Sequence, residues 1–133
     1  MNIAKIEGIG SVYAAKLSEH GIKTTEVLLK VAASRKGRQD LAKKTGISAL
    51  LILEWVNRAD LMRVKGVGEE YSDLLEAAGV DTVKELAHRR PENLYKALLE
   101  TNAKKRLVRR DPSLSEVQSW VSQAKALPPA ITH

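Results

Sequence analysis

Apolar residues recur along most of this chain at helical spacing. One i, i+3, i+4, i+7 stripe, the pattern that lines one face of a helix, is formed by Ile52, Trp55, Val56 and Ala59. No segment alternates apolar and polar residues between hairpin turns, so a β-sheet is not expected. The pattern therefore predicts an all-α protein. The expected helices span residues 11–20, 25–33, 37–45, 49–59, 69–78, 83–89, 91–101 and 114–126.

Glycine, threonine and serine mark the expected helix ends. Gly21 and Gly79 suit the left-handed position that commonly ends a helix. Thr24 and Thr82 follow where the next helix needs a cap, and Ser113 stands three residues before a glutamate, which is capping-box spacing. These signals predict short helices joined by tight turns.

The chain also repeats itself. The segment Ile6–Gly10 (IEGIG) recurs as Val64–Gly68 (VKGVG), and the residues matched after it keep the same interval of 58. The stripe around Trp55 recurs around Trp120 at an interval of 65. Fixed intervals of this kind indicate a duplicated module. We therefore expect two tandem helical repeats packed into one compact unit.

The second copy is longer than the first by seven residues. Comparison of the two copies places the gain between Leu99 and Ser113, where the basic run Lys104–Arg110 lies. The sequence thus divides into a first repeat at residues 1–60 and a second at 61–133, with a basic insertion at 100–112.

Composition excludes several classes of protein. With 133 residues and no Cys, the chain has room for a core but not for disulfides or thiolate metal sites, and its three His are scattered. We expect neither a metal nor a cofactor. Residues 1–5 do not read as a signal peptide, and no apolar run reaches membrane-spanning length. The expectation is a cytoplasmic protein that does not associate with membranes.

Charge points to an anionic partner. The net charge is +6 and the sequence pI is about 9.7. Residues 1–58 hold ten Lys or Arg against five Asp or Glu, whereas residues 59–103 hold six against nine. Positive charge returns in Lys104–Arg110, where five of seven residues are basic. A basic balance of this kind attracts polyanions.

The two Gly-x-Gly segments are the candidate chemistry. Glycine is needed where a turn adopts positive φ or where the backbone approaches a ligand closely. Amides after such a turn point outward at a helix N-terminus and form a site suited to phosphate. Tight helix packing without any ligand is an alternative explanation for both segments.

These residues resemble known helical motifs. Gly8-Ile9-Gly10, with Ala14 and Leu17 after it, resembles the helix-hairpin-helix motif of DNA repair and recombination proteins. The string from Leu17 to Leu28, Leu-x-x-x-Gly-Ile-x-Thr-x-x-x-Leu, is similar to the helical C-terminal domain of the bacterial RNA polymerase alpha subunit. Over nearly its full length the chain resembles a bacterial family of tandem helix-hairpin-helix proteins described only as a domain of unknown function. The resemblance implies a SAM-like fold with two tandem helix-hairpin-helix repeats.

The second hairpin differs from the first in charge. Glu69 and Glu70 occupy the first turn after it, and Asp73 and Glu76 extend the same acidic face. Carboxylates there stabilise their own helix dipole and repel a phosphate. We therefore expect the first hairpin to be the better nucleic-acid contact and the second to be structural or protein-binding.

The leading hypothesis is a non-enzymatic, sequence-nonspecific DNA-binding module with no catalytic residue. Its expected phosphate-binding residues are Gly8, Ile9, Gly10, Ser11, Lys5, Lys16, Lys104, Lys105, Arg106, Arg109 and Arg110, and the weaker second hairpin comprises Lys65, Gly66, Val67 and Gly68. The alternative is a protein-interaction adaptor that uses the acidic second hairpin and does not bind DNA. Its protein partner would bind through the second repeat.

Overall fold

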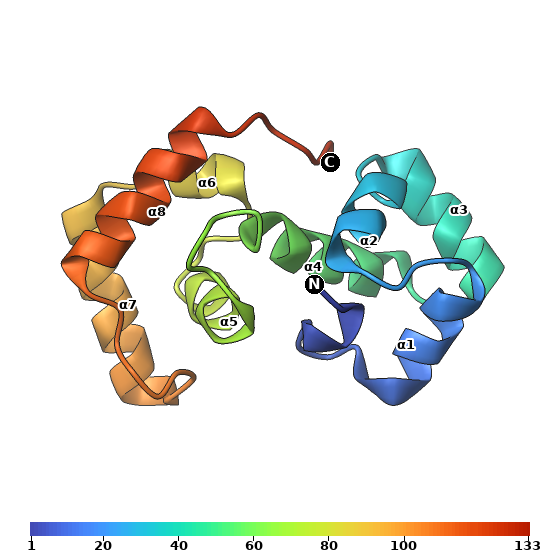
Figure 1. Ribbon diagram of the computed structural model, residues 1–133, viewed down its shortest axis with the longest axis horizontal. Helices are drawn as coiled ribbons and strands as arrows, with labels where there is room; N and C mark the ends of the chain where they lie inside the picture. Colours follow the sequence, from blue (N-terminus) through green and yellow to red (C-terminus); the bar gives the residue numbers. More distant parts are fainter. The chain divides into compact units, whose positions relative to one another are not determined.

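The computed structural model describes residues 1–133 and is all-helical (Figure 1). The elements are η1 (Ile3–Lys5), α1 (Gly10–Glu19), α2 (Thr25–Val31), α3 (Arg35–Thr45), α4 (Ala49–Leu61), α5 (Glu69–Ala77), α6 (Val83–Ala87), α7 (Pro91–Lys105) and α8 (Leu114–Ala126). All eight expected helices are confirmed. Two differences stand out, since the 3₁₀ helix η1 was not expected and α7 continues four residues past residue 101.

The predicted helix ends are confirmed in detail. The Thr24 hydroxyl accepts a hydrogen bond from the amide of Val27, and the Thr82 hydroxyl accepts one from Glu85, both at 3.2 Å. At the start of α8, Ser113 and the Glu116 side chain form a complete capping box. These bonds satisfy first-turn amides that have no partner inside the helix.

The chain folds into two compact units. Unit 1 comprises Met1–Asp60 together with Ala130–His133, and unit 2 comprises Leu61–Pro129. The sequence division had placed residues 130–133 in the second repeat. They belong instead to unit 1, because the Thr132 amide donates to the Ala33 carbonyl at 2.9 Å.

Unit 1 has an aliphatic core built around one tryptophan. Trp55 on α4 is 2% exposed, and its ring centroid lies 5.2 Å from that of Tyr13 on α1, with the rings tilted by 56°. The other core residues are Ile3, Ile6, Ile9, Leu17, Ile22, Leu28, Ala32, Leu41, Ile47, Ile52, Val56 and Ala59.

Unit 2 repeats this local packing. Trp120 on α8 is 1% exposed, and its ring lies 5.1 Å from that of Tyr71 on α5, with a tilt of 53°. The surrounding cluster consists of Leu61, Val64, Val67, Leu74, Leu75, Val80, Val83, Leu86, Leu94, Leu98, Val108, Val117, Val121 and Ala124. The sequence repeat therefore corresponds to a repeated tyrosine–tryptophan arrangement in the two cores.

The extra length of the second copy lies in α7 and the connection after it. The link from α3 to α4 covers residues 46–48, whereas the link from α7 to α8 covers residues 106–113. Asn102 holds this longer link in place, because its side chain accepts from the amide of Val108 at 3.0 Å and donates to the Val108 carbonyl at 3.2 Å. Val108 is consequently buried, at 7% exposure.

Candidate nucleic-acid interface

The first glycine turn connects η1 to α1. Ile6 and Ile9 are buried on either side of it, and Gly8 between them has a φ of +89°. A methyl group at Gly8 would lie 3.7 Å from Nε1 of Trp55, so the turn runs close over the indole. The apolar residues fix the turn in the core while Gly8 itself remains exposed.

The helix that follows this turn starts without a cap. Ile9 is the N-cap residue of α1 and makes no side-chain cap hydrogen bond, and the first turn holds no acidic residue. Gly10, Ser11 and Val12, the first three residues of the helix, are all exposed. Their amides have no acceptor within the helix, so the N-terminus of α1 is a potential anion site.

A guanidinium lies beside this turn that sequence reasoning had missed. Arg58 on α4 donates to the carbonyl of Glu7 at 3.0 Å. In unit 2, Gln123 on α8 donates to the carbonyl of Lys65 at 3.1 Å. Arg58 and Gln123 are separated by the same 65 residues as the two tryptophans, so the repeat interval was a usable signal for this position. This exchange places a guanidinium beside the first turn, which itself carries Glu7, and a neutral amide beside the second, which itself carries Lys65.

The two lysines expected beside the first hairpin lie at different distances from it. Lys5 is exposed at the end of η1, two residues before Glu7 in the first glycine turn. Lys16 is exposed in the last turn of α1, six residues beyond Gly10 and roughly 9 Å along the helix axis from it. Lys5 therefore precedes the glycine turn, and Lys16 is on the far half of α1.

The second glycine turn is also held by buried apolar residues, but the helix after it begins differently. Val64 and Val67 are buried, Gly66 has a φ of +94°, and a methyl group at Gly66 would lie only 3.0 Å from Nε1 of Trp120. Gly68 is the N-cap of α5, with an extended backbone. Lys65 is exposed, and its amide donates to the Gln123 side chain at 2.8 Å.

The first turn of α5 is acidic, as expected from the sequence. Glu69 and Glu70 are its first two residues and both are exposed. Their carboxylates stabilise the positive end of the α5 dipole. The corresponding positions of α1 hold no carboxylate, although within the turns themselves the first carries Glu7 where the second carries Lys65.

The basic insertion is only partly available. Lys104 and Lys105 form the end of α7, and Arg106 adopts a left-handed backbone with a φ of +49° just beyond it. All three are exposed. Arg109 is 94% exposed, with its Nε 3.9 Å from Oε1 of Glu70.

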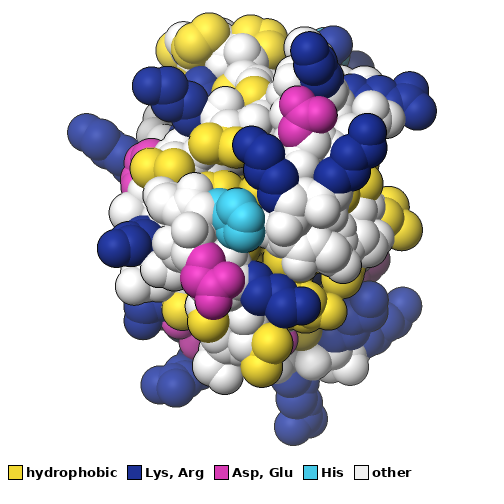
Figure 2. All heavy atoms as spheres, turned by 90° about the vertical axis from the view of Figure 1, so that its right-hand side faces the viewer, with side chains coloured by type: hydrophobic (Ala, Val, Ile, Leu, Met, Phe, Trp, Pro, Cys, Tyr) yellow, Lys and Arg dark blue, Asp and Glu magenta, His cyan; other side chains and the backbone are white.

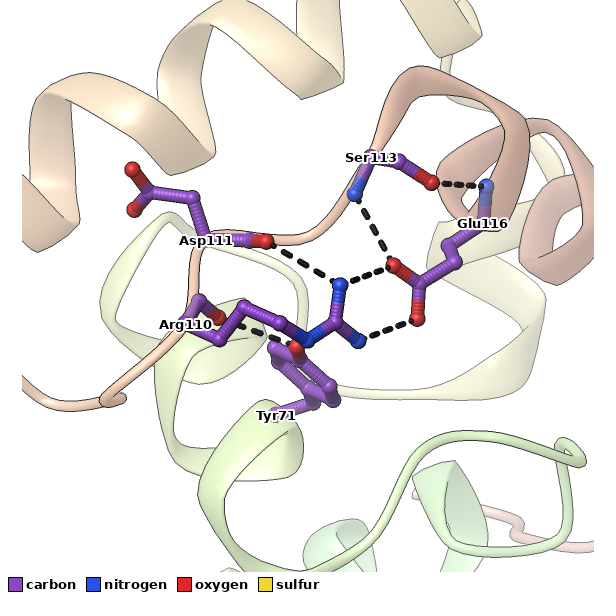
Figure 3. Close-up of polar contacts among 5 residues, drawn as sticks. All are labelled: Tyr71, Arg110, Asp111, Ser113 and Glu116. Atoms are coloured by element: carbon purple, nitrogen blue, oxygen red, sulfur yellow. Dashed lines mark hydrogen bonds and ion pairs between the residues drawn. The ribbon is translucent and has the colours of Figure 1, made fainter.

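Arg110 is committed to a structural network (Figure 3). Its guanidinium makes two hydrogen bonds to the Glu116 carboxylate, at 2.8 and 2.9 Å, and lies 5.9 Å from the centre of the Tyr71 ring. The Tyr71 hydroxyl donates to the carbonyl of Arg110 at 2.9 Å. Arg110 therefore secures the insertion against α5 and α8 and is not a free phosphate ligand.

The network perturbs the titration of its members. The Arg110 guanidinium, followed by the amide of Ser113, lowers the pKa of Glu116 from its ordinary 4.5 to about 2. Glu116 in turn raises the pKa of Arg110. Partial burial raises the pKa of Tyr71. The Arg110–Glu116 pair is thus charged over the whole physiological pH range.

The structure does not bring all the expected site residues together in one unit. Gly8–Ser11 belong to unit 1, whereas the insertion Lys104–Arg110 belongs to unit 2, where Arg109 and Arg110 contact α5 and α8. The insertion belongs to the same unit as the second glycine turn, not the first.

Two open hollows lie on opposite sides of α3 in unit 1. One, of about 260 Å³, is lined by His20, Ile22, Val31, Gly37, Asp40, Leu41 and Lys44, and the other, of about 330 Å³, by Arg35, Arg38, Gln39, Ala49, Leu50, Leu53 and His133. No group of three or more His, Asp or Glu side chains converges in the way that a metal site requires.

The fold and these turns define an all-helical protein with two units, each carrying a glycine turn over a buried tryptophan. The chain belongs to the family described as Domain of unknown function (DUF4332), whose profile matches residues 7–127. Comparisons with curated proteins and with solved structures found no match. None of the helices combines the length and apolar character needed to cross a membrane. The family supplies no activity, so the function must come from the site itself.

Proposed function

We propose that the protein is a non-enzymatic, sequence-nonspecific DNA-binding module built from two tandem helix-hairpin-helix repeats. In this proposal the first-turn amides of α1 hold a backbone phosphate, and basic side chains add salt-dependent attraction. No base is read, because phosphate contacts carry no sequence information directly.

The observation that carries the proposal is the exposed, uncapped N-terminus of α1. Helices usually satisfy their first amides with a capping side chain, as Thr24, Thr82 and Ser113 do elsewhere in this chain. The start of α1 has neither a cap nor a carboxylate. A phosphate oxygen would satisfy these amides and also interact favourably with the helix dipole.

Two neighbouring cations favour a phosphate at the same turn, whose own Glu7 carries the opposing charge. Arg58 places a guanidinium against the carbonyl of Glu7, and Lys5 is exposed just before it. At the second turn, Glu69 and Glu70 oppose a phosphate, which supports a weaker or purely structural role for Gly66–Gly68. The exposed Lys104, Lys105 and Arg106 supply phosphate contacts within unit 2.

A carboxylate introduced at the first turn tests the proposal. Ser11 is exposed at the second position of α1 and corresponds, 58 residues on, to Glu69. We expect Ser11→Glu to weaken binding to random-sequence duplex DNA about fivefold and to reduce the salt slope by roughly 1, as for one lost phosphate contact. The measurement is fluorescence anisotropy between about 50 and 200 mM salt.

The helix dipole provides an internal control. A glutamate in the first turn stabilises the helix, so Ser11→Glu should keep or raise the melting temperature while it lowers affinity. The neutral Ser11→Gln should bind almost as the wild type does, and Glu69→Ser should bind slightly more tightly. Wild-type protein that does not bind duplex DNA at low salt, or equal affinities for Ser11→Glu and Ser11→Gln, would contradict the proposal.

The adaptor remains the second candidate. The observation in its favour is the exposed pair Glu69 and Glu70 at the start of α5, which fits a basic protein surface better than it fits DNA. A basic partner would lose affinity on Glu69→Ser, the opposite of the change expected for DNA. The sign of that single effect separates the two functions.

A further inference from the structure

We propose that α3 is the principal DNA-backbone contact of unit 1, through a surface formed by Arg35, Lys36, Lys43 and Lys44, which we call the α3 basic face. This inference rests on the proposed DNA-binding function and names the helix that supplies most of the attraction. It moves the main electrostatic contact from the insertion at Lys104–Arg110 to a helix in the same unit as the first glycine turn.

The four residues form an extended array of charge. All four are exposed, as the pairs Arg35 with Lys43 and Lys36 with Lys44, and they spread over the exposed half of α3, from Arg35 at one edge to Lys44 at the opposite edge. Each pair is eight residues apart, which corresponds to roughly 12 Å along the helix axis. Because duplex DNA carries one negative charge per about 1.7 Å of its length, a face of this size meets several phosphates at once.

None of the four charges is held in an ion pair, although the exposed Asp40 lies one helical turn from both Lys36 and Lys44. No hydrogen bond or ion pair is seen from any of the four residues, and the one acidic residue on α3 is Asp40. In unit 2, by contrast, Arg110 bonds Glu116, and Arg89 bonds Glu85 at 3.0 Å. Figure 2, which shows the side of the molecule where α3 lies, has Lys and Arg side chains scattered over it and fewer Asp or Glu.

A buried arginine adds to this positive potential. Arg38 is only 4% exposed, and its guanidinium donates to three carbonyls, those of Ala32, Ala33 and Thr132, at 3.0, 2.9 and 2.7 Å. None of these partners carries a charge. Burial and the nearby charge of Arg35 both lower the pKa of Arg38, the direction expected where positive charge is not balanced by an anion.

The side chains on α3 select a duplex backbone as the partner. Its exposed residues are all polar or charged, so the helix has no apolar stripe with which to enter a membrane or a hydrophobic peptide groove. It also carries no aromatic residue on which the bases of a single strand would stack. Charge at regular spacing without stacking groups suits the phosphates of double-stranded DNA.

The test compares two variants of the full chain that lose the same charge. One variant is Arg35→Gln/Lys36→Gln/Lys43→Gln/Lys44→Gln, and the control is Lys84→Gln/Arg90→Gln/Lys96→Gln/Lys125→Gln, four exposed residues of unit 2. Binding to a random-sequence duplex is followed by anisotropy as salt rises. We expect the α3 variant to lose at least tenfold in affinity and about 3 units of salt slope, since each phosphate contact contributes roughly 0.9. The control should change the slope by less than about 1.

The outcomes separate this inference from the function on which it rests. Equal losses of DNA affinity in the two variants would overturn the α3 basic face but leave the DNA-binding function intact. Wild-type protein that does not bind duplex DNA would overturn both proposals. Loss confined to the α3 variant, with Ser11→Glu unaffected, would support the α3 face and remove the amide site. The α3 inference would also be overturned if the protein bound anionic phosphatidylserine vesicles more tightly than duplex DNA and the α3 variant lost that vesicle binding.

Folding is checked by circular dichroism and melting temperature. Should the fourfold variant unfold, the pairs Arg35→Gln/Lys36→Gln and Lys43→Gln/Lys44→Gln take its place, each with an expected slope loss of about 1.5. Replacement of the three lysines by arginine should leave the slope unchanged, because the contact depends on charge.

Discussion

At the scale of the residue, the most informative contacts are those that tie a side chain to the backbone of a distant segment. Arg58 binds the carbonyl of Glu7, Arg38 binds three carbonyls of unit 1, and Tyr71 binds the carbonyl of Arg110. Each bond satisfies a carbonyl in a turn or link, where no helix supplies a donor. These side chains therefore hold the irregular segments in place.

The ion pair of Glu116 with Arg110 predicts that the stability of the protein depends on pH. Its pKa is about 2 in the folded protein and near 4.5 ordinarily, so the pair with Arg110 contributes stability above about pH 4.5 and loses it as pH falls towards 2. We expect Glu116→Gln to lower the free energy of unfolding by about 1 kcal/mol at neutral pH and to have little effect at pH 2. Urea unfolding at several pH values measures this.

Glutamine is a matched replacement, because it keeps the side-chain oxygen that accepts from the Ser113 amide at 3.0 Å in the capping box. An equal effect of Glu116→Gln at pH 6 and at pH 2 would show that the ion pair contributes nothing.

At the scale of the element, the two glycine turns have the same backbone arrangement but differ in how much room they leave for a side chain. Gly8 and Gly66 both have positive φ and both lie over an indole, but the approach to Trp120 is closer than the approach to Trp55, at 3.0 against 3.7 Å. The turn in unit 2 therefore has less room for any side chain.

This difference predicts an order of destabilisation. Gly8→Ala should cost about 1–2 kcal/mol because of its left-handed backbone, and Gly66→Ala should cost more because Trp120 must also move. Gly68→Ser is the control, since Gly68 has a φ of −99° at an N-cap, where serine is favoured. Thermal unfolding of the three variants gives the order, and a Gly8→Ala variant less stable than Gly66→Ala would refute the reasoning.

At the scale of the whole molecule, charge and chain path differ between the two units. Unit 1 holds ten Lys or Arg against six Asp or Glu, and unit 2 holds twelve against ten, so the excess of positive charge is larger in unit 1. The last residues of the chain belong to that unit, where Thr132 bonds both Ala33 and Arg38. The bonding of Arg38, on the same helix as the α3 basic face, thus depends on the end of the chain.

Removal of residues 130–133 should therefore loosen unit 1 at the α2–α3 corner. We expect amides near Ala33 and Arg38 to lose hydrogen-exchange protection by about tenfold, since a buried guanidinium loses one of its acceptors. Amides of α8 in unit 2 should be unchanged. Thr132→Ala is the control, because it keeps both backbone groups, and protection that is unaltered by the deletion would contradict this role for Thr132.

The sequence by itself determined the helices, their caps, the repeat and the contrast in charge between the two glycine turns. Helix periodicity and capping depend on residues within a few positions of one another, so each can be predicted from a short stretch of sequence. The DNA-binding function and its phosphate site remain predictions.

Only the tertiary structure decided which distant groups meet. It paired Arg58 with Glu7 and Arg110 with Glu116, buried Arg38, and returned residues 130–133 to unit 1. The basic run at Lys104–Arg110 looked uniformly available in the sequence, yet one of its arginines is fixed in a network. Contacts between remote residues follow from how helices pack and where links lead, and no local pattern encodes these.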